Sequence, residues 1–201
     1  GQFTAGLTVG YEASALTGAG QHQSLASGFP VGKRFHSAPV IRLADAMPMQ
    51  LGHAIDADGR WRVFIFAGQK DTGQPNGPTA RLCRFLETAA SSPVRRFTRP
   101  GENIDAVVDV RAVFQQGFRD LNYTAMPSLL RPHKGRYGLC DYEKVFCADL
   151  KSGDDIFAMR GIDRAAGCVV LVRPDQHVSV LLPLEDYEGI ANFFGGFLLP
   201  A

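Results

Sequence analysis

One short run of apolar residues limits the possible folds of this chain more than any other feature. Every residue from Val63 to Ala67 is apolar, within a strand predicted from Arg60 to Gly68. A strand with one face in solvent would alternate apolar and polar residues, so this strand is expected at the centre of a sheet covered on both faces. The 201 residues are enough to build one domain of this kind.

The remaining elements follow from periodicity and from turn residues. Pro78 suits the first turn of a helix over residues 79–90, whose buried stripe is Leu82, Phe85, Leu86 and Ala89. Asp58-Gly59 predicts a hairpin between residues 53–56 and the central strand. Further along, the sequence predicts a strand at 104–114, a short helix at 153–159 begun by Asp154 or Asp155, strands at 168–172 and 178–182, and a final helix at 184–199.

The predicted order is strand, helix, strand, helix, strand, strand, helix. This is the α/β thioredoxin-like plan, a mixed sheet with helices on both faces. Residues 142–150 are ambiguous. In the final helix, the side chains expected to face inward are those of Tyr187, Ile190, Ala191, Phe194 and Leu198.

Residues 1–50 are expected to form an extended N-terminal arm and lead-in, and residues 51–201 the thioredoxin-like domain. The first 30 residues are rich in Gly, Ala, Ser, Thr and Gln and lack apolar periodicity. The segment also carries Phe29, Phe35, Val40, Ile41 and Leu43, which need a covering surface. The domain can cover some of these groups, and the others are expected to contact a second copy or a neighbouring domain.

The sequence predicts no catalytic, cofactor-binding or metal-binding residue in this chain. A thioredoxin-like redox site needs a Cys where the first main strand turns into its helix, and residues 68–79 contain none. Cys83 lies inside the helix beside its apolar stripe, and Cys140, Cys147 and Cys168 form no closely spaced pair. The histidines, His22, His36, His53, His133 and His177, do not have the spacing of a metal site. No glycine-rich loop joins a strand to a helix as a dinucleotide site requires.

Composition argues against two classes of partner. The net charge of +1 provides no field that would attract nucleic acid or an anionic membrane surface, and no apolar run approaches the length of a bilayer span. The first residues contain neither an initiator Met nor the basic and apolar regions of a signal peptide. From this we expect a cytoplasmic location, and a start of this kind suggests a fragment, a processed product or a trimmed chain.

Arg173-Pro174-Asp175 joins two predicted strands, and two interpretations of it remain open. The three residues could contact a ligand or cofactor. Alternatively, Pro presets a turn angle and Asp bonds its own backbone, and this second interpretation is the one that turn statistics favour.

Several segments together resemble one known family. The segments are Phe3-Thr4-Ala5-Gly6 followed by Tyr11, residues 32–39 and 42–45, Leu51-Gly52-His53, residues 61–68, residues 142–146, residues 172–178 and residues 193–198. They are similar to the C-terminal domain of the flavin-dependent phenol 2-monooxygenases and 3-hydroxybenzoate 4-hydroxylases. The resemblance extends over nearly the whole chain.

The resemblance implies a part of an aromatic-ring monooxygenase that uses FAD, NADPH and oxygen. It implies a thioredoxin-like domain without redox cysteines that supports dimer contacts, with the flavin site in a preceding domain. The expected partners are a second copy and the flavin domain of the same enzyme, and the chain alone is expected to be inactive. Two alternatives remain: a stand-alone thioredoxin-like scaffold protein and a thiol-dependent redox enzyme.

Overall fold

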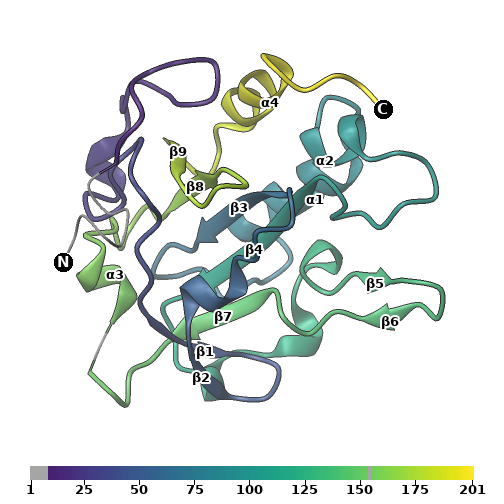
Figure 1. The fold of residues 1–201 in the computed structure, drawn as a ribbon. Coiled ribbons are helices and arrows are strands. Elements are labelled where there is room, and N and C mark those ends of the chain that lie inside the picture. The colour runs from purple at the N-terminus through teal and green to yellow at the C-terminus, as the bar shows by residue number, and fades with distance from the viewer. Residues whose placement is uncertain (1–8, 154) are drawn as a thin grey trace.

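A seven-stranded mixed sheet runs through the molecule in the order β2-β1-β7-β4-β3-β8-β9 (Figure 1). The computed structural model describes residues 9–153 and 155–201, so the segment Phe3-Thr4-Ala5-Gly6 and Asp154 lie outside the described residues. The strands of the sheet are β1 (Pro39–Arg42), β2 (Met47–Gln50), β3 (Trp61–Phe66), β4 (Val108–Phe114), β7 (Val145–Ala148), β8 (Cys168–Val172) and β9 (Val178–Leu182).

The other elements surround this sheet. The α-helices are α1 (Pro78–Thr88), α2 (Pro93–Phe97), α3 (Ile156–Met159) and α4 (Tyr187–Gly195). A separate hairpin pairs β5 (His133–Lys134) with β6 (Leu139–Cys140). Short 3-10 turns are η1 (Gln23–Leu25), η2 (Leu51–Ala54), η3 (Phe118–Asp120), η4 (Tyr123–Ala125) and η5 (Ser128–Leu130).

The central strand is β3, as its apolar sequence predicts. It pairs in parallel with β4 and antiparallel with β8, and all six of its residues are buried. Val63 and Ile65 enter a core on the side of α1, α2 and α4, while Phe64 and Phe66 enter a second core on the side of α3 and the lead-in. Both faces of the sheet are therefore covered by this chain, and the pairing of β4, β3, β8 and β9 confirms the thioredoxin-like plan.

The predicted helices are present, with one addition. Helix α1 begins at Pro78, and its first turn is supported by the Asp71 carboxylate, which accepts a hydrogen bond from the Thr79 N–H at 2.7 Å. Beyond the predicted helix, Pro93 opens the short helix α2, and the Ser92 hydroxyl caps its first turn. Asp155 caps α3, and Ile190 and Phe194 are the buried residues of α4.

Two expectations about the first sixty residues are wrong. Residues 51–54 form η2 and both neighbours of β3 are occupied by β4 and β8, so the predicted hairpin does not exist. Within residues 1–50, β1 and β2 belong to the main sheet, since β1 pairs with β7. In β1, Ile41 is buried in the first core and Val40 in the second, whereas no residue of β2 is buried.

The lead-in, defined here as residues 9–38, lies on the body of the domain. Phe29 and Phe35 stack with ring centroids 4.6 Å apart inside the second core. All five apolar residues that were expected to need a covering surface, Phe29, Phe35, Val40, Ile41 and Leu43, are buried within this chain. The sequence therefore identified buried residues correctly but assigned some of them to the wrong surface.

The two edges of the sheet differ. The lead-in covers β9: the Val178 N–H donates to the Lys33 carbonyl at 2.8 Å, and the Gly18 N–H donates to the Ser179 carbonyl at 2.9 Å. Gly32 permits a close crossing here, because a Cβ atom at this position would lie 2.1 Å from the Tyr11 carbonyl oxygen. The opposite edge, β2, has no such cover in the described part of the chain.

Candidate interaction surface

The described thiols are not arranged for redox chemistry. Cys83 is buried inside α1, and burial raises its pKa above the ordinary value. Burial likewise raises the pKa values of Cys147 and Cys168 to about 12, so neither is a thiolate near neutral pH. Cys140 is half-buried at the end of β6. None of these four thiols lies at the start of a helix.

The other candidate residues are also accounted for by structure. Among the described residues, no group of three or more His, Cys, Asp or Glu side chains could hold a metal ion. Arg173-Pro174-Asp175 forms a turn in which the Gln176 N–H donates to the Arg173 carbonyl at 2.9 Å. The Arg173 guanidinium also lies 4.2 Å from the centre of the Tyr11 ring, and that ring meets His177 edge-on. The turn therefore anchors the lead-in.

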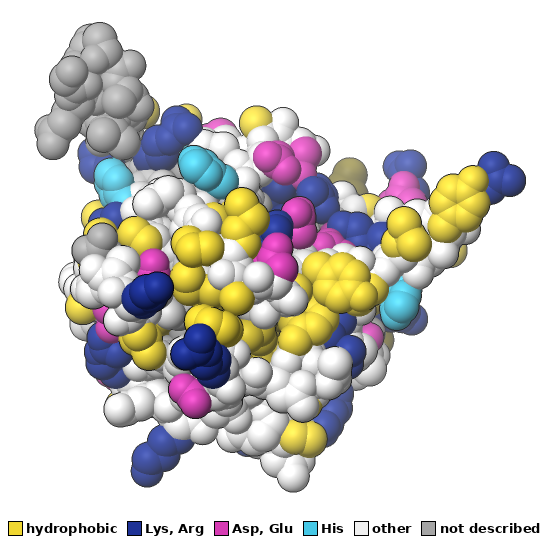
Figure 2. Space-filling model, turned by 90° about the horizontal axis from the view of Figure 1, so that it is seen from below, with side chains coloured by type: hydrophobic (Ala, Val, Ile, Leu, Met, Phe, Trp, Pro, Cys, Tyr) yellow, Lys and Arg dark blue, Asp and Glu magenta, His cyan; other side chains and the backbone are white. Residues whose placement is uncertain are grey.

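Exposed apolar side chains gather on a different part of the surface. We define the apolar band as six residues with exposed fractions between 38% and 80%: Met47, Phe118, Tyr137, Leu139, Tyr142 and Leu150. They flank the β1–β2 edge. Leu150 lines one hollow of the surface and Tyr142 lines another, and residues of the turn at 44–46 contribute to both. Figure 2 shows hydrophobic side chains gathered across this face and extending onto a projecting arm.

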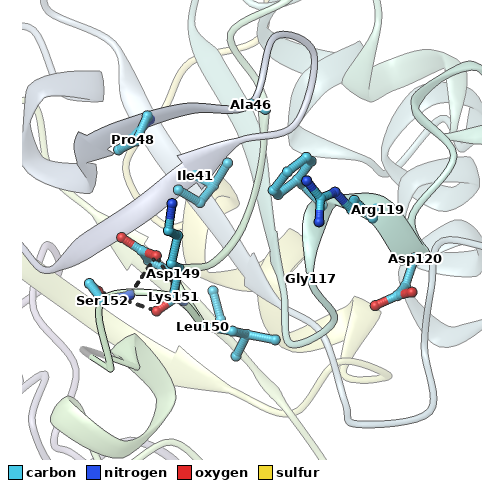
Figure 3. A pocket seen from close by; sticks show the side chains of 12 residues that line it. Ile41, Ala46, Pro48, Gly117, Arg119, Asp120, Asp149, Leu150, Lys151 and Ser152 are labelled. Atoms are coloured by element: carbon cyan, nitrogen blue, oxygen red, sulfur yellow. Dashed lines mark hydrogen bonds between the residues drawn. The ribbon is translucent and has the colours of Figure 1, made fainter.

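An open hollow of about 830 Å³ occupies one end of this face. Ile41, Ala46 and Pro48 line it from the β1–β2 pair, and Gly117 to Asp120 line it from the turn after β4 (Figure 3). Leu150 and Lys151, from the turn after β7, complete the wall. The Asp149 carboxylate accepts hydrogen bonds from the N–H groups of Lys151 and Ser152, each at 3.2 Å, and so fixes the shape of that turn.

The β5–β6 hairpin projects at the other end of the face (Figure 1). Tyr137 at its tip is 80% exposed and Leu139 is 69% exposed. The Arg136 guanidinium lies 5.8 Å from the centre of the Tyr137 ring. The tip therefore presents an aromatic ring, an aliphatic group and a positive charge together.

A cluster of charges fixes the base of this hairpin. Lys134 in β5 contacts the carboxylates of Asp105 at 2.7 Å and Asp141 at 2.9 Å. Lys144 contacts Asp105 at 2.6 Å and also pairs with Asp109, which is fully buried. Burial opposes ionisation of Asp109, but the positive charges of Lys144 and Arg111 outweigh it and hold the pKa of this carboxyl below its usual range. Because so many partners meet at its base, the hairpin is held in one direction.

Sequence reasoning missed this surface. The sequence predicts no helix or strand in residues 115–136, and the hairpin and the turn after β4 both begin inside that stretch. One usable signal was present: Gly135 and Gly138 bracket Arg136-Tyr137, and both glycines adopt positive φ angles of 69° and 59°. Two strands joined by a loop of three to five residues that contains Gly are typical of a hairpin, and here the loop is residues 135–138.

The comparisons with known proteins agree on one family. Residues 9–201 match the family described as phenol hydroxylase, C-terminal dimerisation domain. The chain is 54% identical over 199 residues to 3-hydroxybenzoate 4-monooxygenase of Comamonas testosteroni, and 36% identical over 202 residues to the FAD-dependent monooxygenase terD of Aspergillus terreus. Each alignment covers 98% of this chain, but only 31% and 32% of the relative, so the chain spans about a third of their length.

Similar solved structures are more distant. A thioredoxin-like superfamily protein is 13% identical with a TM-score of 0.42, and the match covers 82% of this chain and 100% of that one. A peroxiredoxin-like protein from Aquifex aeolicus is 13% identical with a TM-score of 0.39, covering 79% of this chain and 82% of that one.

Proposed function

The chain belongs to the family of phenol hydroxylase C-terminal dimerisation domains, and we propose that it joins two copies of a flavin-dependent aromatic hydroxylase. The observation that carries this proposal is the apolar band on a domain whose own cores are already closed. A stable protein–protein contact needs an apolar patch beyond the core, and monomers rarely expose large ones. The band supplies this patch beside the uncovered β2 edge.

On this proposal, catalysis takes place in another part of the parent enzyme, the longer hydroxylase to which this chain would belong. We propose that the parent hydroxylates a phenol or hydroxybenzoate with FAD, NADPH and oxygen, and that these are bound outside the described residues. The names of the relatives, a 3-hydroxybenzoate 4-monooxygenase and an FAD-dependent monooxygenase, support the reaction class. On this proposal the chain alone is inactive and contributes no catalytic, cofactor-binding or metal-binding residue.

The placement of the domain in the parent enzyme follows from the same proposal. Residues 1–50 then arrive from a preceding flavin domain, and the lead-in attaches that domain to the body. No helix in the described ranges is both long enough and apolar enough to span a membrane. We propose a cytoplasmic enzyme whose partners are its own second copy and its own flavin domain, without nucleic acid or membrane contacts.

Sedimentation equilibrium of the 201-residue chain tests this function. We expect a dimer at micromolar concentration and no flavin absorbance after dialysis. Leu139→Asp should weaken the dimer about 10-fold or more, because it places a charge in a desolvated contact. Leu199→Asp, which changes an exposed residue outside the apolar band, serves as the control. A wild-type chain that remains monomeric would argue against the proposed function.

A further inference from the structure

We propose that each copy of this chain inserts its β5–β6 hairpin into the hollow of the other copy. In this arrangement the Tyr137 ring fills the apolar part of the hollow, and Arg136 lies opposite Asp120 at its rim. The proposal rests on the proposed dimerisation function and adds to it the surface and the residues that pair.

The hairpin has the properties of a preformed anchor. The Gly135 N–H donates to the Asn103 side chain at 2.9 Å, and the His133 ring contacts the Gly138 carbonyl at 2.8 Å. Together with the contacts of Lys134, these bonds hold the tip away from the body of its own chain. An aromatic side chain held exposed on a rigid arm loses little conformational entropy when it binds, which is the usual character of an interface hot spot.

The hollow fits such an anchor in size and in chemistry. Its volume of about 830 Å³ is in the range of small-ligand sites, so it has room for a tyrosine side chain. Ile41, Pro48 and Leu150 give it apolar walls, and Arg119 and Lys151 add cations suited to the face of a tyrosine ring. Because the Asp149 carboxylate bonds to its own turn, Asp120 is the lining carboxylate that remains to face Arg136.

The positions of the hairpin and the hollow match a two-fold dimer. The hollow lies at the carboxyl ends of the parallel strands β4 and β7, formed by residues 117–120 and 149–152. The hairpin is attached at the amino ends of the same strands, through Asp105 and Lys144. The seven residues of β4 separate them by about 20 Å. If two copies place these faces against each other, with a two-fold axis midway between hairpin and hollow, each hairpin meets the hollow of the partner.

A second copy is therefore the occupant that fits this face best. The dimer contains two such contacts, so neither a hairpin nor a hollow remains free to bind a third copy. The β2 edge inside the face carries Pro48, which has no N–H to donate to an added strand. Side-chain packing, rather than extension of the sheet, is accordingly the mode of association we infer.

Charge reversal with rescue tests the pairing of Arg136 with Asp120. We expect Arg136→Glu and Asp120→Arg each to weaken the dimer about 10-fold to 100-fold, and the double variant to recover most of that loss. Arg95→Glu, an exposed substitution in α2, is the matched control and should leave the dimer unchanged. Rescue by the double variant would not occur if the two residues lay apart.

Cross-linking tests the same contact independently of affinity. Tyr137→Cys combined with Leu150→Cys should form an intermolecular disulfide under mild oxidation, while Tyr137→Cys combined with Leu199→Cys should not. The wild-type chain measures the background from Cys140. A dimer that forms normally without this cross-link and ignores the charge reversals would overturn the inference and leave the dimerisation function intact. A monomeric wild-type chain would count against both.

Discussion

Buried charge is concentrated at the amino ends of β4 and β7. Asp109, Lys144 and the Arg62 guanidinium are almost completely buried, and the Arg62 Nε atom lies 3.0 Å from an Asp109 carboxylate oxygen. Charges taken from water are tolerated only while each keeps its partner, so the loss of one member is costly. This cluster supports the hairpin on which the proposed dimer contact depends.

We expect Asp109→Asn to destabilise the fold by about 3 to 5 kcal/mol, since Lys144, Arg62 and Arg111 each lose a fully buried anionic partner. Urea unfolding monitored by circular dichroism gives this difference. Asp45→Asn, which removes an ion pair between half-exposed Arg42 and exposed Asp45, is the control and should cost less than about 1 kcal/mol. Equal effects of the two substitutions would show that the buried cluster has no special role.

The same cluster sets a dependence of stability on pH. For Asp58, Asp105, Asp109 and Asp141, burial opposes ionisation, but neighbouring Lys and Arg charges and hydrogen bonds lower each pKa below its usual value. A lowered pKa in the folded state stabilises the fold above the unfolded value of about 4, and this stability is lost as the pH falls below it. When the pH falls below about 4, the free energy of unfolding should therefore decrease less in Asp109→Asn than in the wild type.

At the scale of elements, the central part of the fold could be predicted from the sequence. The apolar run of β3, the Pro78 start of α1 and the Asp155 cap of α3 are local signals, and the structure confirms each. The hairpin predicted at residues 53–56 failed because β4 and β8 occupy both sides of β3, and residues 51–54 form η2 instead. Local pattern cannot reveal partners that the fold brings together.

The apolar band and the hollow could not be predicted from the sequence, because they are formed by segments that are far apart along the chain. Residues 117–120, 133–140 and 149–152 contain too few apolar residues to show periodicity, and only the tertiary fold places them along one face. The lead-in shows the reverse case. Its composition predicted an extended arm, but contacts from the turn between β8 and β9, more than 140 residues away, hold it in place.

We expect Arg173→Ala to loosen the lead-in without unfolding the domain. Arg173 stacks on Tyr11, donates to the Thr17 hydroxyl at 3.3 Å and pairs with Asp175 at 2.8 Å. Loss of a cation–π contact worth about 0.5 to 2 kcal/mol should raise cleavage by a protease at residues 9–18 by about 2-fold to 30-fold. Arg96→Ala, which removes a similar contact with Phe97, should not change cleavage there. An unchanged rate in Arg173→Ala would show that the turn does not anchor the lead-in.

For the whole molecule, the lead-in and the apolar band have complementary roles. The lead-in closes the β9 edge and is packed into the second core, so on the proposed function the preceding domain is coupled firmly to this one. The uncovered β2 edge and the hairpin face away from that attachment and remain available to a second copy. The domain would thus hold two flavin domains in a fixed relation.

Amide hydrogen exchange at increasing protein concentration tests this account most directly. If the chain dimerises through the apolar band, exchange should slow at residues 117–120, 133–142 and 149–152 as the concentration passes through the dissociation constant. Exchange in α4, on the helical face of the sheet, should not change with concentration. Protection that appears on α4 instead, or exchange that is independent of concentration throughout, would contradict the central claim.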